Sequence, residues 1–87
     1  MELKFYKQAI NDYTQAIQLD PKNAQYYSIR GTAYSLLNKY ERAIDDFNQA
    51  IQLDPKYATA YNNLGIALSD QKKLDEAVAA YRKAIEL

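Results

Sequence analysis

The chain has 87 residues, of which 48% are hydrophobic, and its 11 basic and 11 acidic residues cancel. It therefore lacks the basic excess with which proteins neutralise nucleic-acid phosphates, and the absence of histidine and cysteine removes the usual catalytic bases, thiol nucleophiles and zinc ligands. No apolar run is long enough to cross a bilayer, and the first residues lack the apolar core of a signal peptide. We expect a cytoplasmic protein that binds neither nucleic acid nor membrane.

The apolar residues predict five helices. Three segments carry apolar or small residues at a spacing of three to four and polar residues between them, as expected for amphipathic helices. We name them B helices, and they cover Tyr6–Leu19, Tyr40–Leu53 and Leu74–Leu87. Between them lie two further segments of helical period, the A helices Ala24–Leu37 and Ala58–Gln71. The expected order is therefore B-A-B-A-B.

Short turns separate the predicted helices. Asp20-Pro21 and Asp54-Pro55 end the first two B helices, because proline disfavours helical backbone at the residue before it and cannot donate its own amide. Each Asp can act as a cap or an Asx turn for the next helix. Asn38-Lys39 and Lys72-Lys73 are the expected turns from an A helix to a B helix.

The chain also repeats itself. Gln-Ala-Ile-Gln-Leu-Asp-Pro-Lys occurs at 15–22 and again at 49–56, and a weaker copy of the same B helix follows at 74–87. The second copy begins at Gln49, where the first begins at Gln15, and the third follows at the same interval, since Leu74 corresponds to Tyr40. A fixed period of this length predicts a stack of similar helical units in place of a globule built around one active site.

Spaced residues in these units resemble the tetratricopeptide repeat, a family with a period of about 34 residues and a Trp-x2-Leu-Gly-x2-Tyr, Ala-x3-Phe, Pro pattern. The second unit carries Tyr27, Arg30, Gly31, Tyr34, Ala43, Phe47, Ala50 and Pro55. The third carries Tyr61, Leu64, Gly65, Leu68, Ala77, Tyr81 and Ala84, and the first half unit Ala9, Tyr13, Ala16 and Pro21. The resemblance implies an all-α fold, a right-handed α-solenoid of antiparallel helix pairs in one domain: a half repeat at 1–23, a repeat at 24–57 and a truncated repeat at 58–87.

Several packing expectations follow from these residues. Gly31 and Gly65 are expected where an A helix closely approaches its B partner. Arg30 stands where the family has leucine, so we expect looser packing or a guanidinium that extends to solvent. Asp45 and Asp46 are expected on a solvated outer face.

The nine tyrosines offer rings on which nucleic-acid bases could stack, but most of them lie on the apolar stripes. We expect these stripe residues to belong to the core: Tyr6, Tyr13, Tyr27, Tyr34, Tyr40, Tyr61 and Tyr81. Tyr26 and Tyr57 lie off the stripes and are expected at the surface.

The resemblance also implies a concave groove, lined by the A helices, that receives a partner's peptide. Carried over by position, the groove residues are Gln25, Ser28, Ile29, Thr32, Ser35 and Leu36 from the first A helix, and Thr59, Asn62, Asn63, Ile66, Ser69 and Asp70 from the second. Asparagine amides can donate to and accept from an extended backbone, although Asn62 and Asn63 fit an ordinary solvated helix surface equally well.

One subfamily grips the terminal carboxylates of chaperone tails with a clamp of Lys, Asn and Arg. Here the Lys and first Asn positions correspond to Ser28 and Thr32, and only Asn63 matches. A groove without cations loses the main electrostatic attraction for such a tail, so this kind of partner is disfavoured.

The leading hypothesis is a module without catalytic activity, cofactor or metal that binds a protein or peptide in the A-helix groove. The first alternative is a self-association module, because the array starts on a B helix and stops without a polar capping helix, so apolar faces are expected at both ends. The second alternative is a scaffold arm of a larger enzyme.

Overall fold

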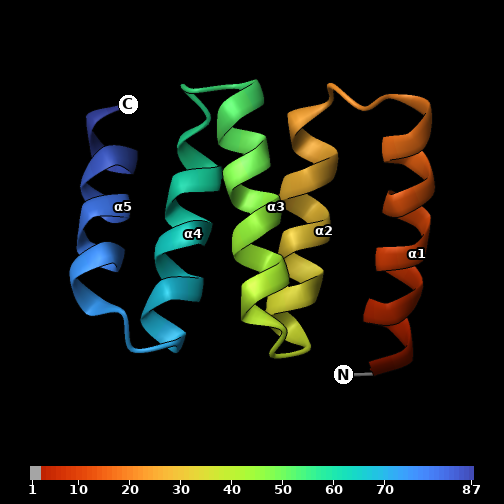
Figure 1. Cartoon of the computed structure of the whole chain (residues 1–87), viewed down its shortest axis with the longest axis horizontal. Helices are drawn as coiled ribbons and strands as arrows, with labels where there is room; N and C mark the ends of the chain where they lie inside the picture. The colour runs from red at the N-terminus through yellow and green to blue at the C-terminus, as the bar shows by residue number, and fades with distance from the viewer. Residues whose placement is uncertain (1–2) are drawn as a thin grey trace.

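A computed structural model describes residues 3–87, which form five α-helices and no strand (Figure 1). The helices are α1 (Leu3–Leu19), α2 (Ala24–Leu36), α3 (Tyr40–Leu53), α4 (Ala58–Asp70) and α5 (Leu74–Glu86). All five predicted helices are confirmed. The main difference in their bounds is that α1 begins at Leu3 and not at Tyr6, because nothing in its first residues breaks the helix.

The helices form a row in which each runs antiparallel to the one before it, and α1 and α5 lie at opposite ends of the row (Figure 1). Each helix contacts the next in chain order, and α2 also contacts α4. Within residues 3–87 the backbones of no other two helices approach each other closely. The molecule is therefore a small solenoid whose Cα atoms extend over 32 × 27 × 17 Å.

The two turns from an A to a B helix have the same shape, since Asn38 and Lys72 both adopt a left-handed backbone with φ of 62° and 63°. The turns that follow the prolines differ in their side-chain bonds. The Oδ1 atom of Asn23 accepts from two backbone amides of α2 and so caps that helix, a role that the sequence had suggested for Asp20. Asp54 forms the expected Asx turn by accepting from the amide of Lys56.

The core is narrow and follows the A–B contacts. Phe47 is the one large side chain of residues 3–87 that is fully buried, and it packs with Ala43 and Ala67. A Cβ atom at Gly31 would lie 2.8 Å from the Phe47 ring, and one at Gly65 would lie 2.7 Å from the Tyr81 ring. Both glycines therefore stand at a close approach, as predicted, and the group they make room for is an aromatic ring of the partner helix.

The expected division of the tyrosines into core and surface holds only in part, since Tyr34, Tyr40 and Tyr81 do pack against the buried clusters. All nine are partly buried, so none is a full core residue and none is fully on the surface. Tyr26 packs against Tyr13 with ring centroids 5.8 Å apart. The physical reason is that a row of single helices has little interior, and a ring with a polar tip can cover apolar neighbours while its hydroxyl remains in water.

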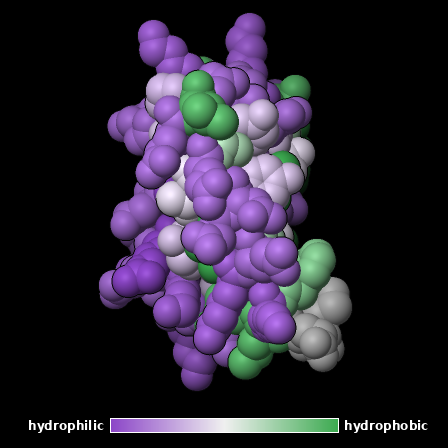
Figure 2. Space-filling model, turned by 90° about the vertical axis from the view of Figure 1, so that its right-hand side faces the viewer, coloured by the Kyte–Doolittle hydropathy of each residue, from purple (hydrophilic) through white to green (hydrophobic). Residues whose placement is uncertain are grey.

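The two ends of the row expose different surfaces. Seen from the α1 end, the surface is mostly hydrophilic, with separate apolar patches (Figure 2). The exposed large apolar residues of α1 are Leu3, Phe5 and Leu19, near its two ends. The predicted apolar face is therefore broken up on α1. On α5 the exposed Leu74, Val78 and Ile85 share one stripe, because they are spaced by four and seven positions.

Candidate functional site

A cleft of about 240 Å³ lies between the two A helices. Its walls come from α2 and α4, and its lining includes Phe47 on α3. The lining residues are Thr32, Ser35, Leu36, Phe47, Asn63, Ile66 and Asp70. We call this hollow the A-face cleft. Phe47 entered the sequence analysis only as part of the repeat pattern, and no sequence signal distinguishes a core ring that also borders a cleft.

The predicted groove residues fall into three groups. Thr32, Ser35, Leu36, Asn63, Ile66 and Asp70 line the A-face cleft. Gln25, Ile29, Thr59 and Asn62 are exposed and Ser69 is partly buried, but these five lie outside the lining. The prediction that Ser28 lies in the groove is wrong, because Ser28 is only 3% exposed and cannot reach a ligand on this surface. Its short side chain lies on α2, which is packed against three other helices.

The polar groups of the cleft suit an uncharged, hydrogen-bonding ligand. The Ser35 hydroxyl is buried beside the cleft and finds no hydrogen-bond partner within residues 3–87, so its bonding capacity is unused. Thr32 donates its hydroxyl proton to the carbonyl of Ser28, which leaves the oxygen free to accept. Ile66 is 44% exposed and supplies apolar contact. Asp70 is the one charged residue in the lining, and it is an anion.

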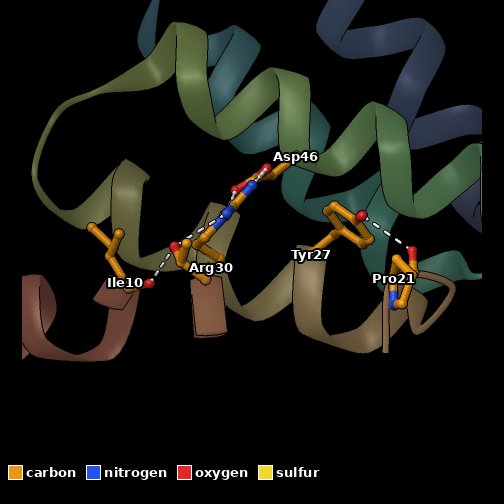
Figure 3. Close-up of polar contacts among 6 residues, drawn as sticks. Ile10, Pro21, Tyr27, Arg30 and Asp46 are labelled. Carbon is orange, nitrogen blue, oxygen red and sulfur yellow. Dashed lines mark hydrogen bonds and ion pairs between the residues drawn. The ribbon is translucent and has the colours of Figure 1, made fainter. Parts of the chain in front are cut away.

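On the side of the B helices, an ion pair joins α2 to α3, and a hydrogen bond from the same arginine reaches α1 (Figure 3). Arg30 on α2 donates to both carboxylate oxygens of Asp46 on α3, at 2.8 and 2.7 Å. It also donates to the Thr14 hydroxyl on α1 at 3.2 Å, and that hydroxyl donates to the carbonyl of Ile10. Two expectations are corrected here: the guanidinium points inward, and Asp46 is buried.

The surroundings of Arg30 explain both corrections. Its guanidinium lies 5.8 Å from the ring centroids of Tyr27 and Tyr34, which stabilise the cation and shield it from water. The bidentate hydrogen bonds to Asp46 raise the pKa of the Arg30 guanidinium above its ordinary value, against the opposing effect of burial. A buried carboxylate needs such a partner, and Asp46 is only 5% exposed. Its neighbour Asp45 is exposed, as predicted.

Neither a metal site nor a membrane span is found in the part of the chain that the structure describes. Over 3–87 there is no group of three or more acidic side chains that could hold a metal ion. None of the five helices combines the length and the apolar character that crossing a membrane requires.

Stacked antiparallel helix pairs with a cleft between the A helices define a helical-repeat solenoid. The family description "TPR repeat" matches residues 1–38 and 31–72, and "Tetratricopeptide repeat" matches residues 58–87. The chain therefore belongs to the tetratricopeptide repeat family, with about two and a half repeats, and has the right-handed all-α solenoid fold expected for it. No curated protein matches the chain closely enough to count as a relative.

Three solved structures illustrate the likeness. The second TPR of Spaghetti (RPAP3) bound to the HSP90 peptide SRMEEVD is 38% identical with a TM-score of 0.91, over 94% of this chain and 76% of that chain. The OM64 TPR domain of Arabidopsis is 36% identical with a TM-score of 0.94, over 97% and 69%. The TPR2B domain of yeast Sti1, in a pHsp70 complex, is 31% identical with a TM-score of 0.91, over 93% and 65%.

Proposed function

We propose that this chain is a non-catalytic interaction module that binds a peptide or an extended protein segment in the A-face cleft. The observation that carries the proposal is the cleft itself: the A helices of two successive repeats bring an amide, hydroxyls and apolar side chains together around a hollow of about 240 Å³. Groups that donate and accept at once suit a peptide backbone, and Ile66 and Leu36 supply apolar contact for its side chains.

The relatives support the class of ligand. The second TPR of Spaghetti holds a heptapeptide, and the TPR2B domain of Sti1 is in a complex with pHsp70. The ligand's charge is expected to differ here. The peptide SRMEEVD has three acidic side chains, whereas the cleft of this chain has an Asp70 carboxylate and no cation in its lining. We therefore propose a neutral or mildly apolar segment as the partner.

A peptide array tests the assignment, and the chain offers its own controls. Asn63→Ala and Ile66→Ala alter the lining of the cleft, whereas Asn62→Ala and Thr59→Ala alter exposed residues of the same helix that lie outside it. We expect the first two variants to bind the wild type's peptides about tenfold more weakly, because a lost hydrogen bond or apolar contact costs about 1–1.5 kcal/mol. The two controls should bind normally. Equal binding by all four variants would show that the ligand lies elsewhere.

A second candidate function is self-association through α5. It is favoured by the exposed stripe of Leu74, Val78 and Ile85, the last being 84% exposed. Static light scattering over a dilution series of the wild type and of Ile85→Lys tests it. A monomer at every concentration would remove this candidate, whereas a concentration-dependent dimer that Ile85→Lys abolishes would support it.

A further inference from the structure

A second hollow lies on the opposite side of α4 from the A-face cleft. Its volume is about 460 Å³, its walls come from α3 and α5, and its floor is formed by Tyr61, Leu64 and Leu68 of α4. These floor residues each lie two positions before Asn63, Ile66 and Asp70, so the two sets point about 200° apart around the helix. We call the hollow the second furrow, and it is independent of the A-face cleft.

The same space exists one repeat earlier, between α1 and α3 over α2, and there the chain fills it. In that repeat Arg30 takes the place of Leu64, Asp46 that of Ala80 and Thr14 that of Asn48. In this first furrow Arg30 bonds to both of the other side chains, Asp46 on α3 and Thr14 on α1 (Figure 3). In the second furrow the corresponding residues are mostly small or apolar. The backbones of α3 and α5 stay apart within residues 3–87, and the hollow lies between them.

The chemistry of the second furrow is apolar at the floor and mainly cationic at the rim. Leu68 and Ala80, only 8% and 6% exposed, join the floor to the core. Two lysines stand at opposite ends of the α5 wall, Lys73 before its first turn and Lys83 in its last turn. Their separation along the sequence corresponds to about 15 Å along a helix. The acidic rim residue Glu76 lies in the first turn, where the helix dipole partly offsets its charge.

These features select one kind of occupant. A cationic side chain like Arg30 of the first furrow would find no carboxylate at the floor, because Ala80 replaces the aspartate, and the two lysines of the rim would repel it more than the single Glu76 attracts it. An apolar side chain finds an apolar floor, and acidic neighbours on either side of it meet Lys73 and Lys83. A gap between two parallel helix walls about three turns long suits the apolar stripe of another helix.

We propose that the second furrow is a docking site for an amphipathic helix of a partner protein, which inserts an apolar stripe flanked by acidic residues between α3 and α5. The geometry of the site differs from that of the A-face cleft, so the two surfaces can hold two partners at once.

The test uses two capped helical peptides, each about four turns or roughly 14 residues long, which is about one turn longer than the furrow. Both carry Leu at positions i, i+4 and i+7, and the flanking positions are Glu in one and Lys in the other. We expect the wild type to bind the Glu peptide at least five times more tightly than the Lys peptide in fluorescence anisotropy, and less tightly as salt is raised.

Two sets of variants then locate the peptide. Ala79→Glu places an anion on the exposed wall of the furrow, and Leu64→Arg with Ala80→Asp transplants the filling of the first furrow. Both changes should lower the affinity for the Glu peptide at least tenfold. Two controls should leave the affinity for the Glu peptide unchanged. They are Gln15→Glu, which makes the same change of charge on distant α1, and Asn63→Ala in the A-face cleft.

Circular dichroism confirms that each variant is folded, and Ala79→Glu suffices if the double variant is not. Equal affinity for both peptides, or a folded Ala79→Glu variant that still binds the Glu peptide normally, would overturn the proposal. So would a wild-type dimer that Ala79→Glu dissociates, because the occupant would then be a second copy of this chain.

Discussion

The first and second furrows are built by corresponding residues of successive repeats, yet one is filled and the other is open. Arg30, Asp46 and Thr14 connect α2, α3 and α1 in the first furrow, whereas Leu64, Ala80 and Asn48 leave about 460 Å³ in the second. At these three positions the first furrow has an ion pair and its hydroxyl partner, where the second furrow has a surface hollow. The comparison teaches that a repeat fixes where helices lie, while the residues between them decide whether a surface is structural or available to a partner.

The largest loss of stability is expected when the aromatic ring that packs against each A-helix glycine, Phe47 or Tyr81, is removed. Phe47→Ala should lower the free energy of unfolding by about 3–5 kcal/mol, because it opens a cavity at a fully buried site. The corresponding Tyr81→Ala should cost about 1–2 kcal/mol, because Tyr81 is partly exposed. Urea unfolding followed by circular dichroism measures both. Equal losses would show that the α2–α3 pair and the α4–α5 pair are packed equally well, contrary to the structure.

The filling of the first furrow can be removed one partner at a time. Asp46→Ala should cost about 3 kcal/mol, because it leaves the partly buried Arg30 guanidinium without its anion. The double variant Arg30→Leu with Asp46→Ala copies the second furrow and should recover most of that loss. The coupling energy of this double-mutant cycle is the measurement, and strictly additive losses would mean that the ion pair contributes nothing to stability.

The close approaches at the two glycines should respond unequally to the same change. Gly31→Ala brings a Cβ atom to 2.8 Å from Phe47, which is enclosed on all sides, so a net loss of about 1–2 kcal/mol is expected. Gly65→Ala makes a similar contact with Tyr81, but that ring lies on the outer helix α5 and can tilt away. The gain in helix propensity of about 1 kcal/mol should then nearly cancel the strain. Thermal unfolding of both variants compares them, and a larger loss at Gly65 would contradict this ranking.

The smallest effect concerns the two turns that lead into α3 and α5. Lys72 adopts a left-handed backbone that Asn38 tolerates better at the corresponding position. Lys72→Asn should therefore raise the free energy of unfolding by about 0.5 kcal/mol. Lys72→Gln removes the same charge without relieving the strain and serves as the control. If both variants changed stability by the same amount, charge and not backbone conformation would be responsible.

Much of this fold could be predicted from local patterns. The 3–4 spacing of apolar residues and the fixed repeat period predicted the five helices, their order and the family. The same information placed Gly31 and Gly65 correctly, because a glycine at one fixed position in each repeat indicates a close approach of two helices. Groups of residues on one helix face could be listed in the same way, which is why most of the lining of the A-face cleft was among the predicted groove residues.

The errors occurred where the environment of a residue depends on helices distant in sequence. Asp46 was expected in solvent because it lies beside Asp45 on a polar segment, and its burial is set by Arg30 on the preceding helix. Ser28 was expected in the groove from its position in the repeat, but neighbouring helices bury it. The tyrosines were assigned from their stripes, although a thin row of helices leaves all of them partly exposed.

The sequence by itself determined the repeat, the five helices, the family and the absence of the residues on which most catalytic chemistry relies, because each of these depends on residue types and their spacing along the chain. The tertiary structure decided which corresponding positions are equivalent in environment and which are not. Arg30 and Leu64 occupy the same place in their repeats, but only the first has an anion and a hydroxyl on the neighbouring helices to bind. That difference arises when the helices are stacked, because burial and electrostatic pairing depend on all the neighbours of a side chain.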